Sequence, residues 1–406
     1  MDGIHGGAAL IATRDYQWKA FTPQMLNMDG WGTYAKVPHA FADPYKSVSR
    51  MYLKLKAQLM PYIYTSAASA ANIETGNADT GLPMIRAMFL EFPNDSYAYS
   101  KNMQYQYMFG DAFLVAPVYQ NTKADSEGND IRNDIYLPGG EVWIDYFTGQ
   151  QYAGGTVINN YAAPLWKLPL FVKNGSIVPM YEENNTPDDI DKNNRIVEFW
   201  PYGSTEYTVF EDDGKYIENN TTEDEEYGTI GNISYGDHVS IKYTSVVDGD
   251  TATLTAGKSS GTYNGYTSEK NTTFVVNVSK EPESVVAKNG NETLKMVKAD
   301  SKDAVLNAEV APGTFVYYYD ESPAIETYAL ESETKIQEMV ADVKVSPKLY
   351  VKFAETDAEV NEQQLVINGF ENDGNLPVDE INDLDIPKNL NTSEVTFDHV
   401  TLNWDT

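Results

Sequence analysis

The segment Arg50–Thr65, RMYLKLKAQLMPYIYT, decides how the first part of this chain is interpreted. It lies within residues 44–72, where apolar side chains recur at helical spacing and Pro44 suits a first helical turn. Pro61 interrupts this pattern, because proline lacks a backbone donor and crowds the preceding turn. We therefore predict one helix over 44–72 that is kinked at Pro61, and a shorter helix around Tyr16–Leu26.

After this helix, short apolar runs alternate with turn residues, and from residue 181 onward the chain shows only strand and turn patterns. In 273–278 and 349–353 every second side chain is apolar, which predicts strands that carry Phe274, Val276 and Val278, or Leu349, Val351 and Phe353, on one face. The fold class predicted from these patterns is mainly β. The other predicted strands are 84–90, 113–118, 134–137, 142–146, 170–172 and 206–210.

The negative charge, −31 in total, is concentrated after Met180. Residues 1–180 are nearly neutral, with 13 basic and 15 acidic side chains, so the change marks a domain boundary. An acidic field repels phosphate backbones, and we expect no nucleic-acid partner. The chain has no cysteine, which excludes disulfides, thiolate zinc sites and a cysteine nucleophile.

No apolar run approaches the roughly 20 residues that span a bilayer, so we expect no membrane span. Met1 is followed by Asp2 and Gly3 rather than by the basic and apolar regions of a signal peptide. Either the protein is cytosolic or Met1 is not its true start. We expect the second, with a signal peptide upstream.

The segment 50–65 resembles the signature R-x-x-L-[RK]-x-x-L-x-P-Y-x-Y-T of glycoside hydrolase family 31. Further motifs resemble those of the family in the same order and at compact spacing, which chance does not plausibly produce. They are 14–23 (RDYQWKAFTP), 81–88 (GLPMIRAM), 91–95 (EFPND), 104–110 (QYQYMFG), 114–118 (LVAPV), 136–138 (YLP), 143–145 (WID), 154–155 (GG), 168–179 (LPLFVKNGSIVP) and 207–214 (YTVFEDDG).

The resemblance implies the end of a (β/α)8 barrel followed by proximal and distal β-sandwich domains. Residues 387–405 resemble the first strands of a fibronectin type III module, which needs about 90–100 residues to close, so we expect truncation at both ends. Phe113, Val115, Trp143, Leu170 and Val172 should lie inside the proximal sandwich. The predicted parts are 1–76 (last βα units of the barrel), 77–180 (proximal sandwich), 181–285 (distal β-domain), 286–370 (further β-rich region), 371–386 (acidic linker) and 387–406 (start of the fibronectin module).

The resemblance also implies a retaining, exo-acting α-glycosidase that removes terminal α-linked sugars from oligosaccharides, polysaccharides or glycans. Such enzymes need two carboxylates about 5–5.5 Å apart, and the family carries both as Asp on earlier barrel strands. No Asp in 1–180 has that context, so we assign no catalytic residue and expect this chain to be inactive alone. An α-transglycosidase and a non-catalytic set of carbohydrate-binding or cell-surface modules remain as alternatives.

What should remain here is the later part of the pocket for the −1 sugar, the sugar whose bond is cleaved. Asp2, in MDGIHGG, takes the place of a sugar-binding Asp of the family, or is a turn residue beside glycines. Arg14 matches in position, with a structural ion pair as the favoured alternative. Trp18 and Trp31 are candidates for stacking on a pyranose, and core packing is the alternative, weaker for Trp31.

One departure from the family concerns the sugar itself. Counting from Phe21 and Pro23 places Met28 where the family has a His that bonds the −1 sugar, and a slip of one residue would place Asp29 there. Asp15 likewise replaces a Trp. These changes indicate a sugar with an axial O4 or a 2-acetamido group, as in the α-galactosidase and α-N-acetylgalactosaminidase branches, or else neutral drift.

Neither a metal site nor a cofactor is expected. The four His are scattered, and the acidic groups around Asp188 and Asp212 suit solvated turns better than a Ca²⁺ site. The expected partner is a carbohydrate substrate, with cell-wall or glycan association through downstream modules. The expected location is secreted or at the cell surface, of bacterial type.

Overall fold

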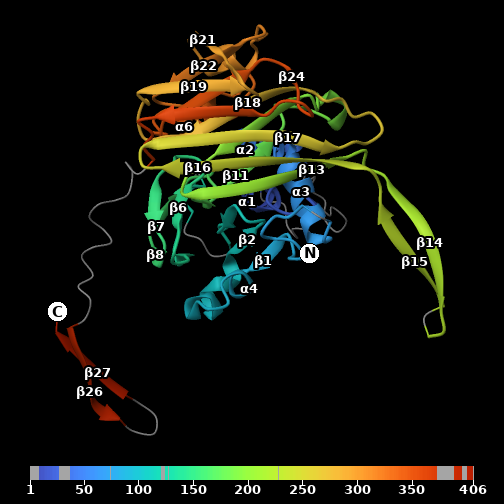
Figure 1. The fold of residues 1–406 in the computed structure, drawn as a ribbon. Helices are drawn as coiled ribbons and strands as arrows, with labels where there is room; N and C mark the ends of the chain where they lie inside the picture. The colour runs from blue at the N-terminus through green and yellow to red at the C-terminus, as the bar shows by residue number, and fades with distance from the viewer. Residues whose placement is uncertain are drawn as a thin grey trace.

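A computed structural model describes residues 9–26, 37–73, 75–119, 124–126, 128–226, 228–372, 388–395 and 400–405. Figure 1 shows a helical part beside a small β-domain, with a larger two-sheet sandwich across both. The fold class predicted from the sequence is confirmed, because strands dominate after Gly81. No helix in the described ranges is both long and apolar enough to cross a membrane.

The N-terminal part is helical, with α1 (Ala9–Lys19), the 3-10 turn η1 (Pro38–Ala40), α2 (Tyr45–Gln58) and α3 (Met60–Ala70). The predicted helix over 44–72 is therefore two helices, which meet at Leu59. Pro61 lies in the first turn of α3, where its missing N–H has no helical partner to lose. The second predicted helix was placed too late: α1 ends at Lys19, where Thr22 Oγ1 lies 2.8 Å from the Lys19 carbonyl oxygen.

The proximal domain is built on a six-stranded sheet with the order β1-β2-β3-β10-β6-β7. Its strands run antiparallel, and Leu170, Phe171 and Val172 of β10 alternate between two hydrophobic clusters. The five side chains predicted to lie inside this domain are fully buried, which confirms that expectation. The sheet strands are β1 (Ile85–Ala87), β2 (Tyr107–Phe109), β3 (Phe113–Val115), β6 (Val142–Asp145), β7 (Gln151–Ala153) and β10 (Leu170–Lys173).

Short elements cover this sheet. Two antiparallel pairs, β4 with β9 and β5 with β8, join α4 and the turns η2 and η3 on the side of Trp143 and Phe171. Their bounds are α4 (Met88–Glu91), η2 (Ser96–Tyr99), η3 (Lys101–Tyr105), β4 (Asp130–Arg132), β5 (Ile135–Leu137), β8 (Thr156–Ile158) and β9 (Tyr161–Ala163).

The distal domain is one sandwich of two sheets. The first has the order β11-β12-β18-β23-β22-β21, with β24 on β18, and the second β13-β16-β17-β25-β19-β20. The strands are β11 (Ile177–Met180), β12 (Asn194–Phe199), β13 (Ser204–Asp212), β16 (His238–Asp248), β17 (Thr251–Gly261), β18 (Glu269–Asn277), β19 (Ser284–Asn289), β20 (Glu292–Thr293), β21 (Lys295–Lys298), β22 (Thr314–Asp320), β23 (Lys348–Phe353), β24 (Thr356–Asp357) and β25 (Gln363–Asn368).

The predicted boundary between 181–285 and 286–370 is wrong. β18 pairs with β23, and β25 lies between β17 and β19, so strands from both sides of the boundary share both sheets. The chain crosses repeatedly between the two sheets, and a cut at 285 would open both. The expectation of only strands after 181 also needs correction, because η4 (Pro187–Asp189), α5 (Lys302–Leu306) and α6 (Thr334–Val340) lie there.

Two antiparallel ribbons stand apart in pairing from these sheets. The first, β14 (Tyr216–Asp224) with β15 (Gly228–Tyr235), projects from the sandwich in Figure 1. The second is β26 (Lys388–Val395) with β27 (Val400–Asp405). That this second ribbon begins a fibronectin type III module stays a prediction, and residues 373–386 of the predicted linker lie outside the described ranges.

One hydrophobic core connects the helices to both β-domains. It runs from Phe21 through Tyr62 of α3 to Phe113 of the proximal sheet and Tyr207 of the distal sandwich. The Tyr62 ring stacks on Tyr207 at 5.8 Å between centroids and meets Phe113 edge-on at 5.3 Å.

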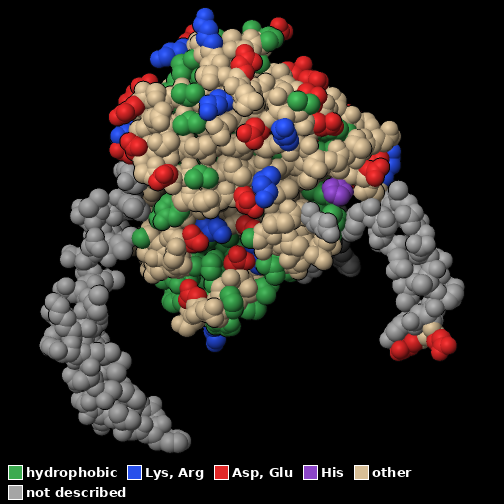
Figure 2. All heavy atoms as spheres, viewed as in Figure 1, with side chains coloured by type: hydrophobic (Ala, Val, Ile, Leu, Met, Phe, Trp, Pro, Cys, Tyr) green, Lys and Arg blue, Asp and Glu red, His purple; other side chains and the backbone are tan. Residues whose placement is uncertain are grey.

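Figure 2 shows the acidic side chains scattered over the visible surface of the sandwich, as expected for solvated charges.

Candidate functional site

Four of the six predicted sugar-pocket residues, Asp2, Met28, Asp29 and Trp31, lie outside the described residues. The other two, Arg14 and Trp18, lie on α1. The geometry of the candidate site is therefore that of α1 and of the side chains that hold it, up to Leu26.

Arg14 is buried, and its guanidinium binds the backbone of the proximal domain. Nη2 donates to the carbonyl oxygens of Ala163 at 2.7 Å and Gly128 at 3.0 Å. Nη1 donates to the carbonyl oxygen of Lys167 at 3.0 Å and to Gln17 Oε1 at 3.1 Å. Burial lowers the pKa of Arg14 to about 10. Arg14 therefore has the structural role that was the favoured alternative, but its partners are backbone carbonyl groups rather than the acidic side chain of an ion pair. A contact between Arg14 and the sugar stays a prediction.

Trp18 is half-buried and packs against the main core. The ammonium of Lys19 lies 5.8 Å from the centre of its ring and pairs with Asp15, the residue that stands where the family has a Trp. Part of the indole therefore faces the core and part remains accessible, so the structure leaves both interpretations of Trp18 in place.

The C-terminal end of α1 is held by two side chains that sequence reasoning missed. Lys56 of α2 donates to the carbonyl oxygens of Thr22 and, at 3.4 Å, of Ala20. The Tyr107 hydroxyl of β2 lies 3.1 Å from the carbonyl oxygens of both Trp18 and Phe21. Helix ends leave carbonyls unpaired, so these donors fix the backbone that leads toward Leu26.

Lys56 carries a further sign of its position. Burial lowers its pKa to about 8, because water no longer solvates the ammonium fully. The sequence offered one signal: a lysine inside an apolar helical repeat has to bury its stem or find acceptors. Tyr107 lies in the motif 104–110, but its partners are 86 and 89 residues away and local patterns do not identify them.

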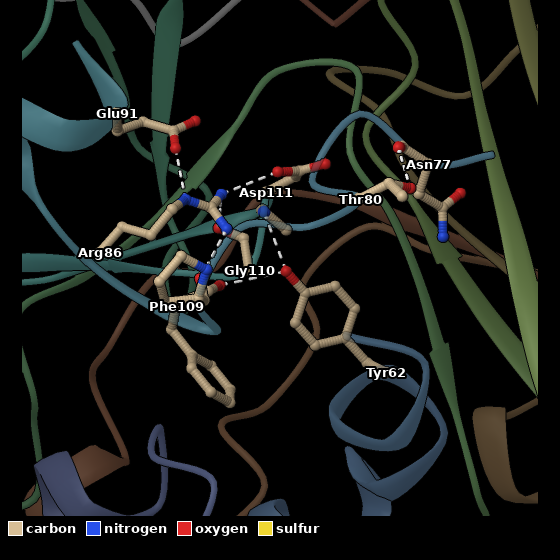
Figure 3. A network of polar contacts seen from close by, with 10 residues as sticks. Tyr62, Asn77, Thr80, Arg86, Glu91, Phe109, Gly110 and Asp111 are labelled. Atoms are coloured by element: carbon tan, nitrogen blue, oxygen red, sulfur yellow. Dashed lines mark hydrogen bonds and ion pairs between the residues drawn. The ribbon is translucent and has the colours of Figure 1, made fainter. Parts of the chain in front are cut away.

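A second polar network joins α3 to the proximal sheet (Figure 3). Arg86 is fully buried and donates to Glu91, to Asp111 Oδ1 at 2.8 Å and to the Gly110 carbonyl oxygen at 2.8 Å. The Tyr62 hydroxyl donates to the Phe109 carbonyl oxygen at 3.1 Å and accepts from the Ala112 N–H at 3.0 Å. These contacts lock the turn between β2 and β3 against the helix.

Two carboxyl groups in this network have raised pKa values. Burial, with the nearby charge of Asp111, raises the pKa of Asp79 to about 6, and burial also raises the pKa of Asp111. Asp79 is only 2% exposed, and Asp111, whose side chain is 24% exposed, is paired with Arg86. We interpret the pair as structural and assign no catalytic carboxylates among the described residues.

Arg50, the first residue of the motif 50–65, forms an ion pair with the distal domain. Its Nη2 donates to Glu333 Oε1 at 2.9 Å, and its Nη1 pairs with Oε2 of the same carboxylate. Lys46 adds a contact to Oε1 at 3.2 Å. These hydrogen bonds lower the pKa of Glu333 to about 2.

Within the described ranges, no group of three His, Asp or Glu is placed to hold a metal ion.

Comparison with known proteins identifies two domains along the chain. Residues 8–66 match the glycosyl hydrolases family 31 TIM-barrel domain, and residues 81–178 match the glycosyl hydrolase family 31 C-terminal domain. The isomaltosyltransferase of Sporosarcina globispora is 37% identical over 184 residues, which are 44% of this chain and 15% of that protein. Alpha-glucosidase 2 of Bacillus thermoamyloliquefaciens is 28% identical over 261 residues, 64% of this chain and 29% of that protein.

Among solved structures, the family 31 dextranase of Flavobacterium johnsoniae, complexed with glucose, is similar with a TM-score of 0.63 and 25% sequence identity. The similarity covers 89% of this chain and 37% of the dextranase. The chain thus spans less than a third of the length of the isomaltosyltransferase and of alpha-glucosidase 2.

Proposed function

Because the chain carries part of the TIM-barrel domain and the C-terminal domain of glycosyl hydrolase family 31, we propose that it belongs to a retaining, exo-acting α-glycosidase. The substrate class is oligosaccharides, polysaccharides or glycans with terminal α-linked sugars. The catalytic pair of Asp residues is then supplied by barrel strands beyond these 406 residues.

The observation that carries the proposal is the way the two matched domains are joined. Tyr52 of α2 donates to the Trp166 carbonyl oxygen at 2.9 Å and accepts from the Leu168 N–H at 2.7 Å, although the partners are more than 110 residues apart. Tyr62 of α3 makes the matching pair of bonds to β2 and Ala112. These four hydrogen bonds join the barrel helices to the C-terminal domain as a common support.

In the proposed enzyme, the barrel helices and the C-terminal domain position the sugar-binding segment and take no part in the reaction itself. A retaining glycosidase works only when two carboxylates and the sugar hold a fixed geometry, with the carboxyl groups about 5–5.5 Å apart. Lys56 and Tyr107 hold the end of α1, and the chain continues from there to Met28, Asp29 and Trp31. The described residues thus supply the anchor of the segment expected to contact the −1 sugar.

The test uses the protein encoded by the complete reading frame. We expect it to hydrolyse p-nitrophenyl α-glycosides, to release the α-anomer of the sugar first, and to form a covalent adduct with a 5-fluoroglycosyl fluoride. NMR identifies the anomer and intact-protein mass spectrometry identifies the adduct. Release of the β-anomer indicates an inverting enzyme and refutes the retaining mechanism. A reading frame that lacks an Asp pair on barrel strands refutes the proposal and favours a non-catalytic carbohydrate-binding protein.

Transfer rather than hydrolysis is the second candidate activity. The 37%-identical relative is named isomaltosyltransferase, which supports transfer between sugars as well as to water. Incubation of the complete protein with maltotetraose separates the two. Glucose and maltotriose alone indicate hydrolysis, whereas oligosaccharides longer than the substrate indicate transfer.

For the −1 sugar itself, we propose that Met28 selects a substituent other than the equatorial hydroxyls of glucose. Support comes from the thioether that stands where the family has a His, since an apolar group there favours an acetamido methyl. The names of the two relatives instead favour glucose. The kcat/KM values for α-glucoside, α-galactoside and α-N-acetylgalactosaminide, with and without Met28→His, decide between them, and an unchanged ranking refutes the role of Met28.

We further propose that the whole protein is exported and that downstream modules attach it to a glycan surface. The support is the resemblance of residues 387–405 to a fibronectin type III module, together with the pairing of β26 and β27. Fractionation of the source cells tests this, and recovery of the protein only from the cytosol contradicts it.

A further inference from the structure

A cavity of about 290 Å³ lies between α3 and the distal sandwich. Arg14 and Trp18, the two described residues predicted for the −1 sugar pocket, do not line it. Its walls come from the first turns of α3, the chain between β11 and β12, and the end of β13. Its lining includes the side chains of Tyr64, Ile190, Arg195, Phe210, Glu211 and Asp212.

The floor of the cavity is apolar and its rim is aromatic. Phe210 and Tyr243 at the floor are 4% and 2% exposed, whereas Tyr64 at the rim is 39% exposed. The rings of Tyr64 and Phe210 lie 6.1 Å apart at an interplanar angle of 39°. Aromatic faces of this kind pack against the C–H groups of a ligand and leave its polar edges free.

Polar groups meet at the same place. Arg195 Nη2 lies 3.2 Å from Glu211 Oε2, and the other oxygen of this carboxylate accepts from the Tyr263 hydroxyl. The Tyr64 hydroxyl donates to Asp212 Oδ1 at 2.7 Å. The arrangement offers both donors and acceptors beside the aromatic rim, which a ligand with several hydroxyls can use.

The charges decide which ligand fits. Arg195 and Glu211 neutralise each other. Among the lining residues that the structure describes, the remaining charges are Lys192 and the two carboxylates of Asp212 and Asp213. The balance is negative, so phosphates and sugar acids are disfavoured. The volume of about 290 Å³ lies just below the range of about 300–1,000 Å³ typical of small-ligand pockets, which suits one sugar unit better than a long chain.

We propose that this cavity is a second carbohydrate site, which binds a neutral pyranose unit by stacking on Tyr64 and by hydrogen bonds to the group around Arg195, Glu211 and Asp212. The choice of a sugar over other neutral ligands rests on the proposed function. The polar stretch 184–194 then has a role in binding, because Pro187 and Ile190 form one wall of the cavity.

The experiment measures binding by the 406-residue chain, without any assay of activity. Saturation-transfer NMR with isomaltose and maltose detects the site, and glucuronate serves as the charged probe. We expect both neutral sugars to bind and glucuronate not to. Tyr64→Ala should weaken binding about fivefold or more, and Tyr64→Phe, which keeps the ring, should weaken it less.

Two further variants make the result specific. Ile190→Trp fills the cavity and should abolish binding without lowering the melting temperature. Tyr202→Ala, at a tyrosine that is 58% exposed and lines a different cavity, should leave binding unchanged. No binding of either neutral sugar, equal binding of glucuronate, or binding that survives Ile190→Trp overturns the proposal. If the cavity binds sugar but the complete protein hydrolyses no glycoside, the second carbohydrate site is supported and the proposed function is refuted.

Discussion

Gly110 is the position where one added methyl group should disturb the junction of the barrel helices with the proximal domain. Its φ of +56° is one that L side chains rarely adopt, and a Cβ there would lie 2.1 Å from the Tyr62 hydroxyl and 2.7 Å from its Cζ. Tyr62 is fully buried and bonded through its hydroxyl to Phe109 and Ala112, so the ring has no free direction in which to move.

The cost of Gly110→Ala follows from these contacts. A left-handed conformation costs a non-glycine residue about 1 kcal/mol, and each of the two hydrogen bonds of Tyr62 contributes about 1 kcal/mol. Displacing a buried ring in a packed core adds about 1–3 kcal/mol. We therefore expect the free energy of unfolding to fall by about 4–6 kcal/mol.

Gly203→Ala is the matched control. Gly203 has nearly the same φ, +57°, but a Cβ there meets nothing within 4 Å, so this variant should lose only the conformational part, about 1 kcal/mol. Urea unfolding followed by tryptophan fluorescence measures both variants. Tyr62→Phe should cost less in the Gly110→Ala background than in the wild type, because the same hydroxyl bonds are already broken. Equal losses for the two glycine variants refute the clash.

Three further predictions concern the ion pair, the anchor of α1 and the activity of the chain. Arg50→Met should lower stability by about 1–3 kcal/mol near neutral pH, because Glu333 is then left with Lys46. Since the pKa of Glu333 is about 2 in the fold and 4.5 ordinarily, this contribution is full above pH 4.5 and lost toward pH 2. The gap between variant and wild type should therefore narrow on acidification, and a gap that is constant from pH 7 to pH 3 contradicts the pairing. Lys56→Met should speed amide hydrogen exchange in 20–26, whereas Lys54→Met, whose ammonium contacts 183–185 instead, should not. The 406-residue chain alone should hydrolyse no p-nitrophenyl α-glycoside, and turnover by a preparation free of other glycosidases would contradict the expected absence of the carboxylate pair.

Several features of the fold were predictable from the sequence because they depend on neighbours along the chain. The helical repeat of 44–72 places α2 and α3, and the alternation of 273–278 and 349–353 places β18 and β23. The five buried side chains of the proximal sheet follow from short apolar runs between turns. The order of motifs also indicated the two family 31 domains that match residues 8–66 and 81–178, since each motif is a local pattern.

Only the tertiary structure determined which distant residues form ion pairs, hydrogen bonds and strand pairs with one another. Nothing in the sequence near Arg50 indicates Glu333, 283 residues away, and nothing near Arg14 indicates the carbonyl groups of Gly128 and Ala163. The predicted domain boundary at 285 was wrong because strands from both sides of it pair in the same two sheets. Such pairing depends on packing between strands that are distant in the chain. Periodicity predicts which side chains of an element share one face. Only the folded arrangement of all elements determines which other elements that face packs against.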